Sequence, residues 1–302
     1  MRYSVIDMGS NSVRHLKAIV KNNKIDGEKS LIVTRLGEGV DETNRLTERA
    51  IRETIDAVKV FQEDAIRTGT EEIYIMATSA VRDAENRVLL LEGVKRATGL
   101  EIEVLSGERE AIVGCLGVQK GLEKEEAILI IDIGGGSTEF IVYDGFIRHA
   151  SSANVGAVRM TGKHVGTDPI TLDEKEKMKE DIKTIIAPHI EAISKYQFDE
   201  IIGIGGTATT FGAIDLEMEN YDRHKIHNHV VLIDAVKQMN QIFQTCDLSM
   251  RKEIAGLAPK RADVITAGGL ILQEIMMSLN YSELRVSDFD NLEGYLVEKL
   301  DL

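Results

Sequence analysis

The chain has 302 residues, a length typical of two domains, and 43% of them are hydrophobic, which excludes an intrinsically disordered chain. Its 36 basic and 50 acidic residues give a formal net charge of −14, which argues against a broad basic surface for nucleic acid. On the same argument, the charge is a poor match for a polyanionic substrate. The apolar runs fall far short of the roughly 18 residues of a membrane span, and the first residues do not have the pattern expected of a signal peptide, so we expect neither feature. The two cysteines lie far apart and lack metal-ligand spacing, so we expect a protein of the reducing cytoplasm. From the apolar runs and the net charge, we expect no membrane and no nucleic acid among its partners.

The first 124 residues alternate between strand-like and helix-like segments, which is typical of an α/β domain. The patterns predict strands over residues 3–8, 12–20, 29–34, 72–77 and 101–105, and helices over residues 47–68, 84–96 and 107–120. Thr47 can cap the first helix and Gly69 can end it. The polar segment 121–126 is the expected boundary between a first domain, residues 1–124, and a second, residues 125–289.

The second half continues the alternation. It predicts a strand–turn–strand unit over residues 127–143, a strand over 200–204, and helices over 172–196, 234–246, 261–279 and 291–300. We expect Pro188 to bend the first of these helices.

Two strand–turn–strand segments share the pattern Asp-x-Gly-x-x-Ser at a constant offset of 125 residues. The matching residues are Asp7 with Asp132, Gly9 with Gly134, and Ser12 with Ser137. Turn glycines let backbone N–H groups approach phosphate oxygens, serine hydroxyls add donors, and an aspartate suits Mg²⁺. A single copy favours a plain hairpin whose aspartate caps the turn, but the duplication favours phosphate binding. The predicted phosphate-binding residues of the two turns are Gly9, Ser10, Asn11, Ser12, Gly134, Gly135, Gly136 and Ser137.

A third glycine element, Gly205-Gly206-Thr207, joins a predicted strand to a predicted helix. Helix N-termini bind anions through their unpaired N–H groups and the helix dipole, so this element is a further candidate phosphate site. The alternative is a tight strand–helix turn with no ligand.

These three glycine elements resemble those of the actin-like, sugar-kinase and heat-shock ATPase superfamily. Further segments narrow the resemblance to the exopolyphosphatase / guanosine pentaphosphate phosphohydrolase family, and they occur in the family's order along nearly the whole chain. These segments are residues 5–12, 77–82, 106–111, 131–139, 205–208 and 261–265.

The resemblance implies an α/β fold of two actin-like (ribonuclease H-like) domains, with the active site in the cleft between them. It implies a short two-domain form that ends at Leu302, whose last helix, about 290–302, packs back on the first domain. The implied activity is Mg²⁺-dependent removal of the terminal phosphate from polyphosphate or from guanosine pentaphosphate. The preference between these substrates, the chain-length preference and the presence of a homodimer stay open.

The family's catalytic glutamate falls on Glu110, which would take a proton from the attacking water. Without the resemblance, Glu110 would be a solvated glutamate in the first turn of a helix. Arg82 would neutralise charge on the transferred phosphoryl group, and the alternative is an ion pair with Asp83 or Glu85.

Glu139 follows Ser137 by two residues, so both side chains face the same side of a strand. With Asp132, and with Asp7 in support, Glu139 would bind the metal. The first hairpin has Arg14 where the second has Glu139, which suits one metal-binding hairpin and one phosphate-gripping hairpin.

A basic string after the third glycine element contains three histidines, and we expect it to line a path for the distal polyanion or to form a solvated loop rather than to bind metal. The string is Arg223, His224, Lys225, His227 and His229, and further basic candidates for the phosphate path are Arg159, Lys163, His164 and Arg261. The net charge does not exclude such a site, because a site is decided locally. Two other functions remain open: a kinase of the superfamily, and a non-catalytic sensor of polyphosphate or of a guanosine polyphosphate.

Overall fold

The computed structural model describes residues 1–122 and 127–302 of the chain. These residues form two compact units, of which the first comprises Met1–Gly117 with Asn291–Leu302 and the second comprises Val118–Asp290. Each unit has its own mixed β-sheet. The boundary expected at residues 124 and 125 lies outside the described residues.

The first unit is built on a five-stranded sheet in the order β3-β2-β1-β4-β5. Its strands are β1 (Arg2–Met8), β2 (Ser12–Lys21), β3 (Lys24–Val33), β4 (Glu72–Ala77) and β5 (Glu103–Val104). β1 pairs antiparallel with β2 and parallel with β4. All of β1 after Arg2 is buried, because helices cover both faces of the sheet at its centre.

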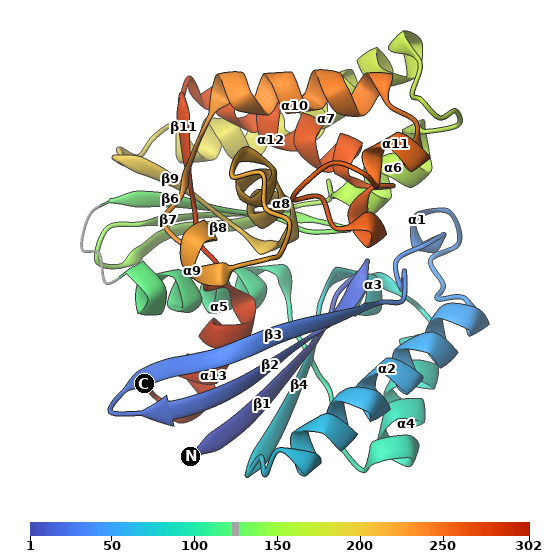
Figure 1. Ribbon diagram of the computed structural model, residues 1–302, viewed down its shortest axis with the longest axis vertical. Helices are drawn as coiled ribbons and strands as arrows, with labels where there is room; N and C mark the ends of the chain where they lie inside the picture. Colours follow the sequence, from blue (N-terminus) through green and yellow to red (C-terminus); the bar gives the residue numbers. More distant parts are fainter. Residues whose placement is uncertain (123–126) are drawn as a thin grey trace. The chain divides into compact units, whose positions relative to one another are not determined.

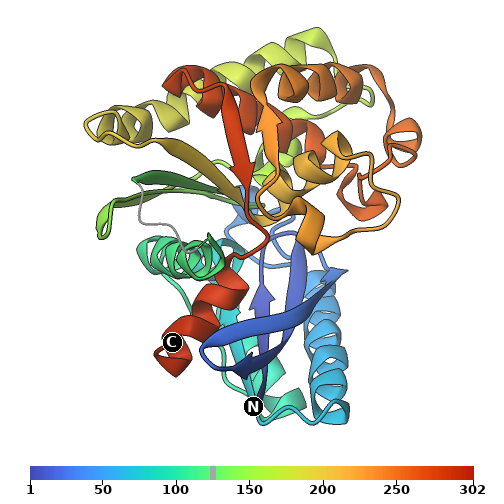
Figure 2. The ribbon, with the colours of Figure 1, turned by 60° about the vertical axis from the view of Figure 1, so that its left-hand side comes forward.

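The helices of this unit are α1 (Val40–Thr43), α2 (Glu48–Arg67), α3 (Ser79–Asp83), α4 (Arg87–Thr98), α5 (Gly107–Leu122) and α13 (Asn291–Leu300). α2 lies on one face of the sheet, and α5 with α13 lies on the other (Figure 2). The apolar side of α2 packs inward, with Ile51, Val58 and Phe61 buried. As expected, the Thr47 hydroxyl caps α2 by accepting a hydrogen bond from the Ala50 N–H.

α13 packs beside α5 in this unit (Figure 1), and polar contacts hold it there. The Tyr295 hydroxyl and the Lys299 ammonium each lie 2.6 Å from the Glu103 carboxylate. The two helices approach so closely that a Cβ on Gly294 would lie 1.7 Å from the carbonyl oxygen of Val113. Only glycine therefore fits at position 294.

The variant Gly294→Ala is expected to lower the free energy of unfolding by about 1–3 kcal/mol, because the new methyl group meets backbone that cannot move aside. Urea unfolding followed by circular dichroism measures the change. Gly162→Ala is the matched control, because Gly162 also lies in a helix but a Cβ there would meet open space. The control should stabilise the chain by about 0.5–1 kcal/mol, and equal effects of the two variants would contradict the close packing.

His15 is a buried base in the same unit. Its Nε2 lies 2.6 Å from the Ser4 hydroxyl, and its ring centroid lies 4.7 Å from that of Phe61. Burial lowers the pKa of His15 from 6.5 to about 4, which outweighs the opposite effect of the Asp64 charge.

Between about pH 6.5 and pH 4, His15 is protonated in the unfolded chain but stays neutral in the folded chain. The free energy of unfolding should therefore fall as the pH drops from about 6.5 to about 4, by at most about 3 kcal/mol from this group. Urea unfolding at a series of pH values should show this loss in the wild type and a flatter profile in His15→Gln, which keeps a polar group but does not titrate. Identical pH profiles would rule His15 out as the cause.

The second unit is built on a six-stranded sheet in the order β10-β11-β9-β6-β7-β8. Its strands are β6 (Ile128–Ile133), β7 (Thr138–Tyr143), β8 (Ile147–Ala153), β9 (Glu200–Ile204), β10 (Val230–Leu232) and β11 (Glu283–Val286). Its helices are α6 (Ala157–His164), α7 (Leu172–Ile193), α8 (Gly205–Asp215), α9 (Arg223–Ile226), α10 (Ile233–Thr245), α11 (Leu248–Arg251), the 3₁₀ turn Pro259–Arg261 and α12 (Ile265–Leu279). α7, α10 and α12 form a helical layer over the sheet (Figure 1).

The two sheets repeat one topology, since β3-β2-β1-β4-β5 in the first corresponds to β8-β7-β6-β9-β11 in the second. The hairpins also share their register. Asp7 faces Arg14 in the first, and Asp132 faces Glu139 in the second, again 125 residues on. Each turn closes through the same hydrogen bond, from the Gly9 N–H to the Ser12 carbonyl at 3.1 Å and from the Gly134 N–H to the Ser137 carbonyl at 2.9 Å. The repeat seen in the sequence is thus a duplicated structural element.

Several elements differ from the expectations. β3 begins at Lys24 rather than at residue 29, because Asn22 and Asn23 adopt positive φ values of 51° and 60° and form a two-residue hairpin turn. α12 begins at Ile265 rather than at residue 261. Pro188 lies inside α7, and the bend expected there stays a prediction. The sequence patterns did not predict α1, α3, α6, α9, α11, β8, β10 or β11, most of which are short.

Candidate functional site

The first hairpin turn is held in place by its neighbours. The Asn11 carbonyl accepts hydrogen bonds from the N–H groups of Thr34 and Arg35, at 3.2 and 3.0 Å. The hydroxyls of Ser10 and Ser79 lie 2.9 Å apart, which joins the turn to the start of α3. The sequence analysis gave Ser79 no role. The signal that could have found it is its position at the start of a helix that follows a strand, much as Thr207 lies in the first turn of α8.

Asp7 lies at the base of the same hairpin and is bound by Arg14. The guanidinium donates from Nε and Nη2 to Oδ2 of Asp7, at 3.0 and 2.5 Å. Both groups are largely buried, with side-chain exposures of 4% for Asp7 and 18% for Arg14. This hairpin therefore carries a matched pair of charges, and a metal-binding role for Asp7 stays a prediction.

Glu110 and Arg82 meet in the first unit, although 28 residues separate them. Nη1 of Arg82 lies 3.0 Å from Oε2 of Glu110 and also donates to the Leu105 carbonyl at 3.1 Å. The Glu110 side chain is only 8% exposed, so it is not the solvated glutamate that its helical position alone would suggest. Arg82 also lies 3.6 Å from Asp83, so the ion pair named as its alternative is present beside the contact with Glu110.

These contacts arise from local structure. Arg82 lies in α3, directly after β4, and Glu110 lies in the first turn of α5, whose N-terminus follows β5. Because β4 and β5 are parallel neighbours, the helices that follow them begin at the same edge of the sheet. The N–H group of Glu110 bonds to the Ser106 carbonyl at 2.9 Å, which fixes the glutamate at the start of its helix.

The second hairpin carries two carboxylates where the first carries an ion pair. Asp132 and Glu139 are direct partners across β6 and β7, and they are 6% and 1% exposed. Oε1 of Glu139 accepts a hydrogen bond from the Ser152 hydroxyl at 2.7 Å. Like charges directly opposite on neighbouring strands repel one another, so this pair favours a cation beside it.

The pair fits Mg²⁺ in its chemistry. Mg²⁺ prefers oxygen ligands and is commonly held by one or two carboxylates together with phosphate oxygens and water. Among residues 1–122 and 127–302, no group of three or more His, Cys, Asp or Glu side chains is arranged to hold a metal ion by itself. Two opposed carboxylates therefore supply part of a ligand set, and phosphate oxygens of a substrate would have to supply more.

The second hairpin turn, residues 134–137, is supported by residues to which the sequence analysis gave no such role. Nε of Arg159 donates to the Gly136 carbonyl at 2.6 Å, so this arginine, a candidate for the phosphate path, supports the turn. A Cβ on Gly156 would lie 2.5 Å from the carbonyl carbon and oxygen of Gly135, so the backbone there passes directly against the turn. No pattern in one sequence could have identified Gly156.

The third glycine element brings two other predicted residues, Asp132 and Arg261, into contact with its own. Gly205 has a φ of +71°, and a Cβ on it would lie 2.2 Å from Oδ1 of Asp132. A Cβ on Gly206 would lie 1.5 Å from Nη1 of Arg261, so the guanidinium rests directly on the N-terminus of α8. Thr207 is buried, and its hydroxyl donates to the Ile133 carbonyl at 3.1 Å, which ties α8 to β6. Carboxylate, guanidinium and helix N-terminus therefore meet at one place in the second unit.

The histidines of the basic string have structural partners. His227 lies 3.2 Å from the Gly121 carbonyl and accepts the Asp288 N–H at 3.3 Å. His229 lies 2.7 Å from Oδ2 of Asp215. Their position on a phosphate path stays a prediction.

Comparison with known proteins connects the chain to phosphatases. Residues 28–302 match the model of the Ppx/GppA phosphatase family. The chain is 30% identical to exopolyphosphatase 2 of Mycobacterium tuberculosis over 97% of both proteins. It is 33% identical to a bifunctional 3-dehydroquinate synthase/phosphatase of Fusobacterium nucleatum over 98% of this chain, but it spans only 46% of that protein. It likewise spans 59% of a guanosine-5'-triphosphate,3'-diphosphate pyrophosphatase of Vibrio atlanticus, at 28% identity.

Solved structures agree in fold. The Aquifex aeolicus member of the Ppx/GppA family is 33% identical, with a TM-score of 0.82 over 99% of this chain and 97% of the other. An exopolyphosphatase from Cytophaga hutchinsonii gives a TM-score of 0.92 at 26% identity, over 100% of this chain and 98% of the other. Within the described residues, no helix is both long and apolar enough to cross a membrane. From the match along residues 28–302 and these full-length likenesses, the chain belongs to the Ppx/GppA phosphatase family and has its two-domain, actin-like α/β fold.

Proposed function

We propose that this protein is a hydrolase that releases the terminal phosphate of inorganic polyphosphate, of guanosine pentaphosphate, or of both. The family and the names of its relatives support this class of reaction. The observation that carries the proposal is the contact between the buried Glu110 carboxylate and the Arg82 guanidinium, which joins a proton acceptor to a fixed positive charge. Phosphoanhydride hydrolysis needs those two groups, together with donors that hold the phosphates.

In the proposed reaction, the Glu110 carboxylate takes a proton from a water molecule while the water oxygen forms a bond to the terminal phosphorus. The bond from that phosphorus to the bridging oxygen breaks, and its electron pair stays on the oxygen of the shortened chain. Arg82 and Arg261 neutralise negative charge on the phosphates. The backbone and hydroxyl groups of the hairpin turns hold the phosphate chain.

We assign the divalent metal to Asp132 and Glu139, because their carboxylates are directly opposed and buried. When bound there, Mg²⁺ would neutralise phosphate charge and orient the phosphate oxygens. The phosphate grip at α8 is assigned to Arg261 and to the backbone of Gly205 and Gly206. We further propose that the protein acts in the cytoplasm.

The proposal is tested by initial rates of orthophosphate release from long polyphosphate, short polyphosphate and guanosine pentaphosphate, each with and without Mg²⁺. We expect orthophosphate to be released from at least one of these substrates, and we expect this release to require Mg²⁺. Tight binding of these substrates without any release would instead favour a sensor. Transfer of phosphate from ATP to a small-molecule acceptor would favour a kinase.

The variant Gly206→Ala is expected to raise KM about tenfold or more, because its methyl group must displace the Arg261 guanidinium, and a charged hydrogen bond is worth about 1.5–3 kcal/mol. The fold should survive, since the displaced group is the far end of a flexible side chain. Gly212→Ala in the same helix is the control, because its Cβ would find its nearest neighbour at an ordinary 3.4 Å. Steady-state kinetics measures KM for both variants. An unchanged KM in Gly206→Ala would show that Arg261 does not bind the phosphate.

A further inference from the structure

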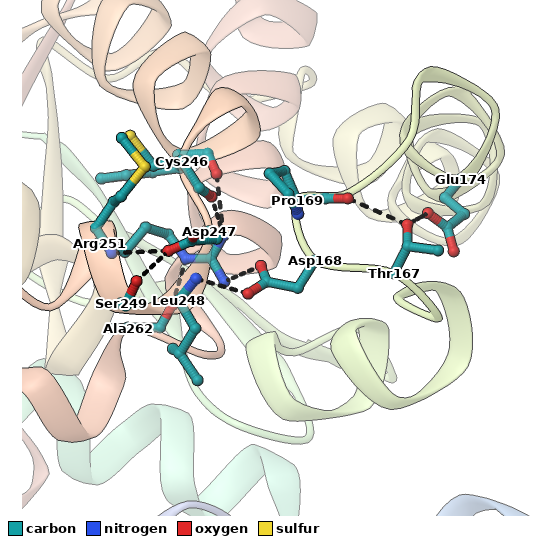
Figure 3. A network of polar contacts seen from close by, with 12 residues as sticks. Thr167, Asp168, Pro169, Glu174, Cys246, Asp247, Leu248, Ser249, Arg251 and Ala262 are labelled. Carbon is teal, nitrogen blue, oxygen red and sulfur yellow. Dashed lines mark hydrogen bonds and ion pairs between the residues drawn. The ribbon is translucent and has the colours of Figure 1, made fainter.

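Arg251 is a buried arginine that the proposed reaction does not use. It ends α11 (Leu248–Arg251), is 5% exposed, and lies at the centre of the network in Figure 3. Its Nε donates to the Ala262 carbonyl at 2.8 Å, and its Nη1 donates to the Cys246 carbonyl at 2.7 Å and the Phe243 carbonyl at 3.2 Å. These are three backbone carbonyls from two separate segments, bound by one rigid fork.

Two of those carbonyls anchor Arg251 to a helix. Phe243 lies in the last turn of α10 and Cys246 is its C-cap, so the guanidinium satisfies carbonyls that the helix leaves without partners. The negative end of the helix dipole also favours the positive charge there. Arg251 is therefore held in position by α10 independently of its bond to Ala262.

Asp168 fixes the other side of the guanidinium. Its Oδ1 lies 2.7 Å from Nη2 of Arg251, and its Oδ2 accepts the Leu248 N–H at 2.6 Å. The loop that carries Asp168 is tied to the first turn of α7, where Glu174 accepts a hydrogen bond from the Thr167 hydroxyl at 2.5 Å (Figure 3). Hydrogen bonds from Thr167 and then Thr171 lower the pKa of Glu174 to about 2, so this tie is kept at neutral pH.

The third carbonyl connects this clamp to the phosphate grip. Ala262 follows Arg261 directly in the chain, and the Arg261 guanidinium rests on Gly206 at the N-terminus of α8. Fixing the carbonyl of residue 262 fixes the backbone from which the Arg261 side chain extends. A displacement of about 1 Å in a substrate-binding group can cost about a hundredfold in rate.

We propose that Arg251, held by Asp168, is a positioning residue for substrate binding: it clamps the backbone beside Arg261 and so aims the Arg261 guanidinium at a phosphate group. The inference rests on the proposed function of Arg261. The alternative is that Arg251 only stabilises the second unit and has no effect on phosphate binding by Arg261. The experiment must distinguish this structural role from the positioning role.

A double-mutant cycle makes this separation. Arg251→Met keeps the apolar bulk of the side chain but removes its donors, and Arg261→Ala removes the proposed grip. In the full-length protein, well below its unfolding temperature, Arg251→Met should weaken binding of inorganic tripolyphosphate about tenfold and raise KM by a similar factor, with a smaller change in kcat. In the Arg261→Ala background, the same substitution should change both quantities less than about twofold. Its effect on thermal unfolding should persist in both backgrounds.

Two further variants keep the test decisive. Asp168→Ala covers the case in which Arg251→Met does not fold, since the Asp168 side chain is 38% exposed, and it should give a smaller effect that also vanishes in the Arg261→Ala background. Arg285→Met is the control, because Arg285 also bonds a carboxylate, at 2.7 Å from Glu200, but belongs to β11. Its tripolyphosphate affinity should stay within about twofold of the wild type.

Equal losses in the two Arg261 backgrounds would overturn the inference and leave a structural clamp. The binding measurements are independent of turnover. If the wild type binds tripolyphosphate but releases no orthophosphate from any substrate, the proposed hydrolase fails while the cycle still reports on positioning. If it releases orthophosphate but the cycle is additive, the positioning role fails and the hydrolase stands.

Discussion

Glu110→Gln is expected to lower kcat by about 10²- to 10⁴-fold, the range that a positioned general base contributes. Glutamine has nearly the same shape and can still accept the hydrogen bond from Arg82 that spans 3.0 Å in the wild type, but it cannot take a proton from water. Substrate binding and the unfolding temperature should therefore change little. Stopped-assay measurement of orthophosphate release, together with tripolyphosphate binding, separates the loss of turnover from a loss of affinity.

Glu108→Gln is the matched control. It makes the same chemical change two residues earlier in the first turn of α5, but Glu108 is exposed whereas Glu110 is buried. The control should keep kcat within about twofold of the wild type, as is usual for surface substitutions. Full activity in Glu110→Gln, or an equal loss in the two variants, would remove Glu110 from the reaction.

Glu139→Gln is the second substitution for which we expect a large effect, and it should lower activity without lowering stability in the absence of metal. Without divalent metal, replacing one of two opposed carboxylates removes a like-charge repulsion, so the unfolding temperature should rise or stay unchanged. Glutamine can still accept the hydrogen bond from Ser152. With Mg²⁺ and substrate, kcat/KM should fall by about a hundredfold or more, since a metal supplies several kcal/mol of charge stabilisation.

The same variant should lose its response to the metal. A ligand that binds only the folded state raises its stability, so Mg²⁺ with orthophosphate should raise the unfolding temperature of the wild type but not that of Glu139→Gln. Glu283→Gln, on an exposed position of β11, is the control and should keep the wild-type response. A normal Mg²⁺ response together with normal activity in Glu139→Gln would place the metal elsewhere.

The duplicated hairpin shows what one sequence can predict. The pattern Asp-x-Gly-x-x-Ser at a constant offset predicts both hairpin turns, and it puts Ser137 and Glu139 on one face of a strand because a side chain two residues on returns to the same face. The pairing across the strands, Asp7 with Arg14 and Asp132 with Glu139, is what the structure adds. The long amphipathic α2 was predictable for the same reason, since its apolar period is strong over many turns.

The parts that escaped prediction depend on contacts between distant segments. β10 and β11 have three and four residues, too few for any periodicity, and they exist because β9 and β10 pair with β11. The contact between Arg82 and Glu110 depends on two parallel strands that place their following helices at one edge. The clamp of Arg251 on Ala262 joins residues that no local pattern connects.

The central claim, attack of water on the terminal phosphorus, is tested most directly by hydrolysis in water enriched in ¹⁸O. We expect each released orthophosphate to carry one ¹⁸O atom and the shortened polyphosphate or the guanosine tetraphosphate to carry none. Label in the shortened chain would mean attack at another phosphorus. Absence of ¹⁸O from both products would mean that water does not form the new bond, and either result would contradict the roles given to Glu110 and Arg82.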